Sequence, residues 1–445
     1  MAKGNGSGKN QRDVRREERR RRRIRNQIIA YLVLVLLIIG VFAGGYFGIR
    51  SLIGMIREAS QNQQSIISGN QIVDSESANN SGVIATPEDM ISENETPVPE
   101  PVDPLQEEIA AYLSAMTLEQ KAANLFIVTP ESITGVTTAT RAGDGTRSAL
   151  SEYAVGGIVY SSRNVQDADQ FQEMLANTKS MYQELYNTEL WMVVREEGAV
   201  NVIAGSAAGV TAQAAAGEIG SSGDTGNAYQ AYLAIGSYLN DYGVDVNLGP
   251  VCDVPGEGSY LGERAFNTDA DIVTSMIQSA VNGQKDGGVI TCLTAFPGRG
   301  SASGDPANGT ATAARGLEEM RSVDFLPFST GIAAGAQMVM VSNVTAEGDV
   351  PCSLSSAMIT DVLRGELGFQ GVVVTEDMDQ KAITDHYSSG DAAVMALQAG
   401  ADMILKPADF AEAYAAVLAA VADGTLTEER IDESLARIYT IKMAD

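Results

Sequence analysis

Short runs of apolar residues recur through most of the chain, and they alternate with segments whose apolar residues are spaced as in helices. Helical spacing is clear in residues 167–185 and 391–400. Runs that are apolar at nearly every position are typical of parallel strands covered on both faces. Eight runs fit strands, namely 124–129, 156–161, 190–194, 244–251, 289–293, 337–343, 371–376 and 401–406.

Eight strand-and-helix units within residues 105–445 predict an α/β fold, a (β/α)8 domain of the TIM-barrel type. An open, doubly wound sheet is the alternative, because it has the same local pattern. In a barrel, the side chains that carry chemistry lie at the carboxyl ends of the strands. The positions to follow are Arg195 to Glu197, Asp253, the loop 297–317, Asn343, and Glu376 with Asp377.

The region before the repeats has a different pattern. Residues 26–49 carry no charged side chain, and residues 28–42 are almost all large and apolar or alanine. Since about 20 apolar residues cross a bilayer as a helix, we expect a transmembrane helix over 26–50. A cleaved signal peptide is the alternative, although its apolar part is usually only about 7–15 residues long.

Charge divides the chain in the same place. Residues 1–25 carry eleven Lys and Arg against three acids, a net charge of +8. Since the net charge of the whole chain is −27, that of residues 26–445 is −35. Because positive flanks stay in the cytoplasm, residues 1–25 are expected to be a cytoplasmic tail, with the bulk of the chain on the far side. Residues 51–104 are rich in Ser, Asn, Gln, Glu and Pro, which predicts a disordered extracellular linker. The acidic bulk argues against a nucleic-acid partner.

Cysteine and histidine restrict the chemistry further. The three cysteines, Cys252, Cys292 and Cys352, form no CxxC motif and lie in apolar runs, so we expect buried free thiols. His386 is the only histidine, which argues against a His-rich zinc site and a His-based catalytic triad. We expect neither a metal nor a cofactor, and we expect His386 in an exposed loop.

Several segments, taken in order, resemble glycoside hydrolase family 3, and within it the β-N-acetylhexosaminidases that trim peptidoglycan fragments. The resemblance spans nearly all of residues 105–445. The segments are MTLEQKAANLFIV (116–128), GGIVYSSRNV (156–165), VNLGPVCDV (246–254), LGERAF (261–266), FPGRG (296–300), LPFSTGIAAGAQMVMVSNV (326–344), LRGELGFQGVVVTEDM (363–378) and ALQAGADMILKP (396–407).

This resemblance implies a retaining mechanism, with a nucleophilic carboxylate at the end of the seventh strand and an acid/base on the loop after the fifth. Together with the expected anchor, it implies a single-pass protein of a bacterial cell membrane with its barrel outside the cytoplasm. The implied partner is a peptidoglycan-like glycan or an envelope protein.

The chain departs from the family pattern at the chemical positions. Glu376 stands where the resemblance places a nucleophilic Asp, and its extra methylene changes the reach of the carboxylate. Asp377 follows directly, but successive strand residues point to opposite faces, so we expect it to point away. The Lys-His pair of the family reads Thr294-Ala295.

Replacements also affect the expected sugar ligands. Arg195 stands in place of an aspartate that binds sugar hydroxyls, and Arg299 in place of a histidine. Asp305 is the candidate acid/base, but its histidine partner falls near Ala307, and an Asp-Pro turn is the alternative role. Arg264 is the clearest retained ligand. The expected substrate-binding residues are Arg264, Arg195, Glu197, Arg299 and Asn343.

Three functions remain open at this point. The first is a glycoside hydrolase-like barrel that binds an N-acetylglucosamine-containing glycan or a protein, with hydrolysis impaired or lost. The second is an active retaining glycosidase with Glu376 as nucleophile, and the third is a structural module with a filled mouth. In the first and third, Glu376 is expected to be a rim residue or to pair with Arg195, Arg264 or Arg299. We favour the first.

Overall fold

The computed structural model describes residues 103–206 and 208–444. The expected cytoplasmic tail (1–25), transmembrane helix (26–50) and nearly all of the linker (51–104) lie outside the described residues. Within the described part of the chain, no helix is both long enough and apolar enough to cross a bilayer.

Eight parallel strands form one sheet in the order β7-β6-β5-β4-β3-β2-β1-β8. A parallel bridge between Val374 and Met403 joins the two ends of this order, so the sheet is a nearly closed barrel. The predicted α/β barrel is thereby confirmed, and the open sheet is not formed. The strands are β1 (Phe126–Val128), β2 (Gly157–Val159), β3 (Trp191–Val194), β4 (Val246–Val251), β5 (Ile290–Phe296), β6 (Met338–Val341), β7 (Val372–Thr375) and β8 (Ile404–Leu405).

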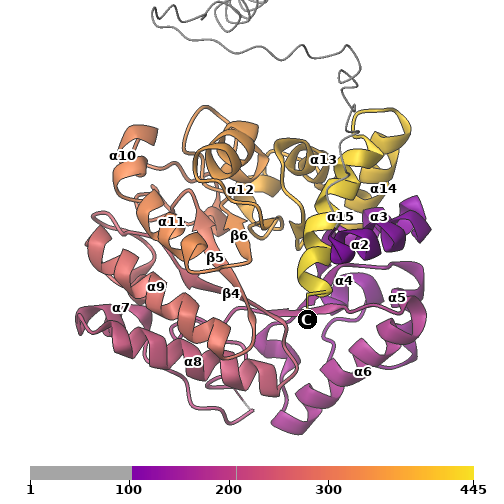
Figure 1. The fold of residues 1–445 in the computed structure, drawn as a ribbon, viewed down its shortest axis with the longest axis horizontal. Coiled ribbons are helices and arrows are strands. Elements are labelled where there is room, and N and C mark those ends of the chain that lie inside the picture. Colours follow the sequence, from indigo (N-terminus) through magenta and orange to yellow (C-terminus); the bar gives the residue numbers. More distant parts are fainter. Residues whose placement is uncertain (1–102, 207, 445) are drawn as a thin grey trace, which may run out of the picture. The chain divides into compact units, whose positions relative to one another are not determined.

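Helices surround the barrel on the outside (Figure 1). The first of them begins at Pro104, one residue before the expected start of the domain. The α-helices are α2 (Pro104–Ala115), α3 (Leu118–Asn124), α4 (Pro130–Thr134), α5 (Asp144–Glu152), α6 (Ala168–Tyr186), α7 (Ala216–Ser221), α8 (Thr225–Asp241), α9 (Ala270–Asp286), α10 (Leu317–Ser322), α11 (Phe325–Ala333), α12 (Lys381–Thr384), α13 (Ser389–Ala399), α14 (Phe410–Ala422) and α15 (Glu428–Lys442). Short 3-10 helices are η1 (Ser162–Asn164), η2 (Gly262–Arg264), η3 (Pro306–Asn308) and η4 (Cys352–Leu354), and η5 (Ala357–Glu366) is a π-helix.

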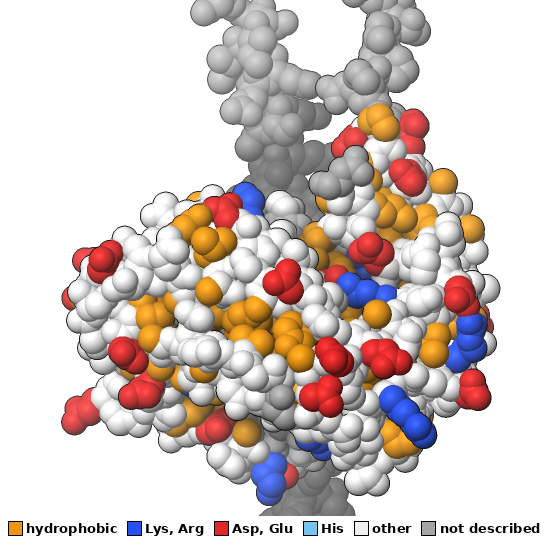
Figure 2. Space-filling view, turned by 90° about the horizontal axis from the view of Figure 1, so that it is seen from below, with side chains coloured by type: hydrophobic (Ala, Val, Ile, Leu, Met, Phe, Trp, Pro, Cys, Tyr) orange, Lys and Arg blue, Asp and Glu red, His pale blue; other side chains and the backbone are white. Residues whose placement is uncertain are grey.

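The strands are buried at nearly every position, as their apolar sequences require. Helices α8 and α9 pack closely where Gly236 faces Gly287, the residue directly after α9. A Cβ atom on Gly287 would lie 2.6 Å from the Cα atom of Gly236, so neither position can hold a larger residue without separating the helices. On the face in Figure 2, acidic side chains outnumber basic ones, in line with the excess of acid in the sequence.

All three cysteines are buried free thiols, as expected. Burial is the main cause that raises the pKa of each thiol, which keeps these groups protonated and unreactive.

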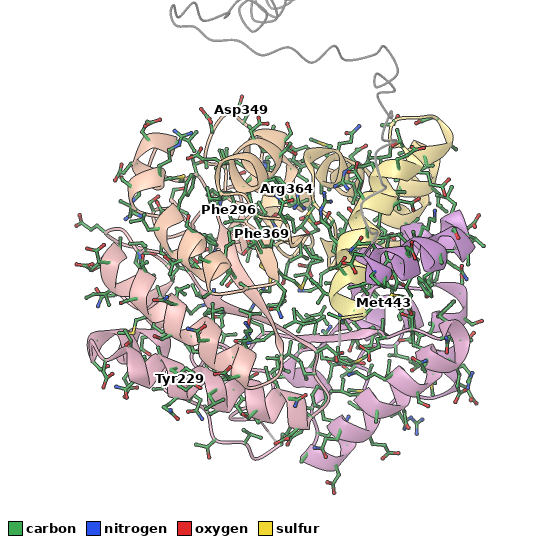
Figure 3. The ribbon with its side chains drawn as sticks, in the orientation of Figure 1. Tyr229, Phe296, Asp349, Arg364, Phe369 and Met443 are labelled. Carbon is green, nitrogen blue, oxygen red and sulfur yellow. The ribbon has the colours of Figure 1, made fainter. Side chains whose placement is uncertain are left out.

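A buried ionic cluster lies at the base of the barrel, where the strands begin. Asp402, just before β8, accepts hydrogen bonds from Arg364 Nη2 (2.6 Å) and Arg437 Nη1 (3.0 Å). The N–H group of Val373 also donates to Asp402 (2.8 Å), and Arg364 also reaches the carbonyl oxygen of Phe369 (3.3 Å; Figure 3). The cluster therefore ties η5 and α15 to the start of β7 and β8.

Candidate functional site

The mouth of the barrel, where the strands end, contains two neighbouring cavities. The first, here called the β7 pocket, has a volume of about 360 Å³ and is lined by residues after β4, β5 and β7. The second, here called the β2 pocket, has a volume of about 590 Å³ and is lined mainly by residues after β1, β2, β3 and β8. Both cavities share a ridge, which consists of Arg195, Asp377, Asp379 and Lys406.

Glu376 follows β7 directly and lines the β7 pocket, but its carboxylate is fully engaged. Arg299 Nη1 donates to Oε1 (3.0 Å), while Ser342 Oγ (3.1 Å) and the N–H group of Asn343 (2.9 Å) donate to Oε2. The residue is only 2% exposed. Both oxygens are therefore held by donors from the barrel wall, in a site that water scarcely reaches.

Arg299 is the centre of this cluster, because it also binds Asp253 at the end of β4. Nε (3.0 Å) and Nη2 (2.7 Å) both donate to Asp253 Oδ2, and the N–H group of Arg299 donates to Oδ1. Burial raises the pKa of Asp253, and Arg299 opposes this rise. Charge attraction from Asp253 and Glu376 outweighs the effect of burial on Arg299 and raises the pKa of its guanidinium well above the usual value. One cation thus sits between two buried carboxyl groups.

Of the three arginines expected as possible partners of Glu376, namely Arg195, Arg264 and Arg299, the structure pairs it with Arg299. Arg264 instead binds Glu197 with two hydrogen bonds, from Nε (2.8 Å) and Nη2 (3.0 Å). Such a bidentate pair fixes the plane of the guanidinium. The rest of the Arg264 side chain lines the β7 pocket.

Asp377 was expected to point away from Glu376, and this prediction is wrong. Both residues line the β7 pocket, because β7 ends at Thr375 and strand alternation no longer applies beyond it. Lys406 Nζ (2.8 Å) and Arg195 Nη2 (3.4 Å) donate to the Asp377 carboxylate. Burial by itself would raise the pKa of Asp377, but these two cations together hold it below the usual value.

Two other predicted residues have structural partners. Asp305 lines the β7 pocket, and its carboxylate also accepts from the N–H group of Ala307 (2.9 Å), as in the alternative turn role. Asn343 is buried behind the pocket wall, where it donates to the carbonyl oxygen of Asp377 (2.8 Å) and accepts from Ser353 Oγ (2.6 Å).

His386 lies in an exposed loop, as expected. Its Nε2 atom lies 2.8 Å from Thr310 Oγ1, so the loop after β7 contacts the loop after β5. Within the described residues, no group of His, Cys, Asp and Glu side chains has the arrangement of a metal site.

The structure therefore brings Glu376, Asp305, Arg195, Arg264 and Arg299 to one cavity. Sequence reasoning missed Lys406 and Tyr260, which line the β7 pocket, and Ser342, which donates to Glu376. Lys406 follows β8 directly, so the rule that selected the other strand ends would have found it. Ser342 follows β6 directly, so the same rule would have found it too. Tyr260 lies within the loop after β4 and carries no comparable signal.

Comparisons with known proteins agree with this architecture. Residues 117–441 match the sequence model of the glycosyl hydrolase family 3 N terminal domain. Beta-hexosaminidase A of Pseudoalteromonas piscicida is 29% identical over 328 residues, which are 66% of this chain and 54% of that protein. A beta-hexosaminidase of Stenotrophomonas maltophilia (strain K279a) is 38% identical over 167 residues, 37% of this chain and 49% of that protein. The chain thus spans about half the length of these curated relatives.

A solved structure shows the same fold. The glycoside hydrolase family 3 beta-N-acetylglucosaminidase from Paenibacillus sp. str. FPU-7 superimposes with a TM-score of 0.70 at 33% sequence identity. The superposition covers 74% of this chain and 62% of that one.

Proposed function

We propose, from the premise that this chain belongs to glycosyl hydrolase family 3, that its barrel binds an N-acetylglucosamine-containing glycan with hydrolysis impaired or lost. The observation that carries this proposal is the closed cluster of Asp253, Arg299 and Glu376. The names of the relatives, β-hexosaminidase and β-N-acetylglucosaminidase, support the class of glycan.

A glycosidase nucleophile must bring one carboxylate oxygen to the anomeric carbon. To free Oε1, Glu376 must break its hydrogen bond with Arg299, and to free Oε2 it must break those with Ser342 and the Asn343 N–H group. The donors released in this way would be left without a partner in the low-dielectric interior. Breaking one partner from a buried ion pair costs about 3–5 kcal/mol. An added cost of this size would slow attack by at least about 100-fold.

Binding does not need Glu376 to move. The β7 pocket presents Arg264, whose orientation Glu197 fixes, and the Asp377 carboxylate, which two cations keep charged. Donors and acceptors held in place before a ligand arrives reduce the entropy cost of binding. The walls of the pocket are thus suited to the hydroxyl and amide groups of a sugar.

The location is also part of the proposal. The apolar segment 26–50 and its basic flank support a single-pass anchor in a bacterial cell membrane, with the N-terminus in the cytoplasm and the barrel outside. The partner there is a peptidoglycan-like glycan, with an envelope protein as the alternative. Deletion of residues 26–50 should release the protein from carbonate-washed membranes, and retention of the deletion variant would contradict the anchor.

An active retaining glycosidase is the second candidate. It is favoured by one observation, that Asp305 and Glu376 line the same cavity and so provide two carboxyl groups around a bound sugar. In that case the ion pair of Glu376 opens when the substrate binds.

Turnover of a chromogenic N-acetylglucosaminide separates the two candidates. The full-length chain is compared with Glu376→Gln, and Glu429→Gln on the exposed first turn of α15 is the matched control. We expect the same background rate from all three, together with N-acetylglucosamine binding that Arg264→Ala weakens. A rate that falls by about 100-fold or more in Glu376→Gln alone would establish hydrolysis and overturn the proposal.

A further inference from the structure

A groove at the base of the barrel, here called the base groove, has no part in the proposed function. It lies between α2, α3 and α6, and its volume is about 210 Å³. Asn124 and Ala154 in its lining lie just before β1 and β2, which places it at the end opposite the mouth. Small-molecule sites have roughly 300–1,000 Å³, so this groove suits a few side chains of a peptide better than a whole ligand.

Tyrosine and apolar side chains form much of the lining of the base groove. Tyr112 lies in α2 and Met116 directly follows it, while Leu185 and Tyr186 lie at the end of α6. All four pack against the core but are only partly buried. Apolar side chains laid over them would remove this surface from water, which is favourable.

Two side chains of the base groove can donate hydrogen bonds to a peptide. Tyr112 Oη lies 3.5 Å from the carbonyl oxygen of Tyr186, at the outer limit of a hydrogen bond, so it can turn to a better acceptor. Gln120 accepts from the N–H group of Thr117 with Oε1 (3.0 Å), so the donor end of its amide can serve a peptide carbonyl group. Aromatic grooves of this kind bind proline-rich segments in the polyproline II conformation.

A segment with the matching pattern directly precedes α2. Residues 97–104 read PVPEPVDP. Because a polyproline II helix has three residues per turn, residues three apart share an edge, and two of its three edges are then wholly apolar. The residues on these two edges are Val98, Pro101 and Pro104, and Pro99 and Val102. Glu100 and Asp103 fall on the third edge, which can stay in water while the other two are buried.

The backbone next to this segment already has the required conformation. Asp103, which leads into α2, has φ −60° and ψ 121°, close to polyproline II. Val98 and Glu100 each precede a proline, as Asp103 does, and such residues are restricted to extended or polyproline II backbone. The segment therefore loses little conformational freedom when it binds.

The segment is also long enough to reach the base groove. Ala115, which lines the groove, follows Pro104 by eleven residues, about 17 Å along α2. Val98 precedes Pro104 by six residues, about 19 Å in polyproline II. If the segment folds back along α2, these two lengths bring Val98 close to Ala115.

We propose that the base groove binds residues 97–102 of the same chain as a polyproline II helix that runs back along α2. The short tether gives this segment an effective concentration in the millimolar range, which an unlinked partner of equal affinity does not reach. The expected disorder of the linker then ends before Pro97. Docking fixes the end of the linker at the base, so that the linker leaves the β7 pocket at the mouth open.

Disulfide trapping in the full-length chain, held in detergent micelles, tests this docking. All three native cysteines are buried, so an introduced pair supplies the accessible thiols. Val98→Cys is combined with Ala115→Cys in the groove or, as the matched control, with Ser114→Cys, which is exposed on α2 outside the groove. With oxidised glutathione, we expect the groove pair to form an intramolecular disulfide about tenfold faster or more, because docking raises the effective concentration of its thiols.

A second variant separates docking from the mere proximity of a flexible tether. Pro97→Gly, Pro99→Gly and Pro101→Gly are introduced together with the groove pair, which removes the preformed polyproline II helix and leaves the barrel unchanged. A docked segment should then form the disulfide more slowly, near the rate of the control pair. An undocked tether would become more flexible and would react no more slowly.

The other outcomes contradict the inference in distinct ways. Equal rates for the groove pair and the control pair, or no disulfide in either, would overturn docking in the base groove. A rate unchanged by the three glycine substitutions would overturn recognition of a polyproline II helix. Disulfide-linked dimers on a non-reducing gel would mean that the groove takes the segment of a second copy, which would overturn binding within one chain.

Discussion

The two ends of the barrel each contain a buried ionic cluster, but the clusters have opposite compositions. At the base, the single carboxylate of Asp402 is bonded to Arg364 and Arg437, with Arg430 Nη1 4.0 Å away. At the mouth, the single guanidinium of Arg299 lies between Asp253 and Glu376. The cluster at the base therefore has excess positive charge and the cluster at the mouth excess negative charge.

This difference matters because the two kinds of group respond differently to a lost partner. A buried carboxyl group can take up a proton and become neutral, whereas arginine stays charged at every ordinary pH. The cluster at the mouth is as fully hydrogen-bonded as the cluster at the base. Its side chains therefore have few free donors or acceptors with which to bind or attack a substrate. Within the mouth, the partly exposed ridge is the part whose side chains can still contact a substrate.

Asp402→Asn should have the largest effect on stability. The substitution leaves the arginines at the base without a counter-charge, and breaking such a buried cluster costs about 4 kcal/mol. Because these arginines cannot lose their charge, the loss should be the same at pH 5 and pH 8. Urea unfolding of residues 97–445 measures it, with Asp361→Asn on the exposed side of η5 as control. A loss that disappears at pH 5 would contradict this account of the base.

Arg299→Met should destabilise the domain by about 3 kcal/mol at pH 8. In the variant, Asp253 remains buried without the cation that opposes the effect of burial, so its folded pKa rises further above that of the unfolded chain. A raised acid pKa stabilises the folded state at low pH, and this contribution is lost as pH rises. The loss relative to the wild type should therefore be smaller at pH 5 by about 1 kcal/mol or more. The same unfolding experiment tests this, and a loss independent of pH would show that the two clusters behave alike.

The sequence was sufficient to predict the barrel, because each strand is a continuous apolar run with its own local signal. β5 is an exception in detail, since it continues three residues beyond its predicted end through Thr294 and Ala295. Strand ends also identified most mouth residues, because that rule depends only on where a strand stops.

Pairing within the mouth could not be predicted from the sequence. Asp253 and Arg299 are 46 positions apart, and Arg299 and Glu376 are 77 apart. Which arginine meets which acid depends on loop paths after the strands, and three arginines were available for Glu376. The base cluster was missed for a related reason, since Asp402 lies at a strand start, where chemistry is not expected.

Asp324→Asn examines another buried carboxylate, which has a single cationic partner, Arg315 (2.8 Å). Burial, with a smaller contribution from Asp253, raises the pKa of Asp324 to about 7, and Arg315 opposes the rise. Since the folded pKa is raised, this group favours the folded state at low pH, and the contribution is lost as pH rises from about 4 to about 7. Stability of the wild type relative to the variant should fall by about 4 kcal/mol across that window in urea unfolding. A constant difference would mean that Asp324 keeps its ordinary pKa.

Lys442→Met should have the smallest effect, and it tests a cation at the base that binds no carboxylate. Lys442 Nζ donates to the carbonyl oxygens of Gly156 (3.0 Å) and Glu189 (2.9 Å), and it lies 5.0 Å from the centre of the Trp191 ring. Burial lowers the pKa of Lys442 to about 7, against the opposing charges of Asp245 and Glu189. A lysine with a lowered folded pKa favours the folded state at high pH, and this contribution is lost as pH falls through 7.

The methionine variant keeps the apolar stem of Lys442 but leaves both carbonyl oxygens without their donor. We expect it to be less stable than the wild type by about 1 kcal/mol at pH 9, with the difference shrinking towards pH 6. Thermal and urea unfolding of residues 97–445 at both pH values measure the change, and Lys285→Met, on the outer helix α9, is the matched control. An equal loss at pH 6 and pH 9 would mean that Lys442 is charged in the folded protein throughout this range, held by carbonyl oxygens and aromatic rings alone. The base would then stabilise buried positive charge without the carboxylate that Asp402 supplies to its arginines.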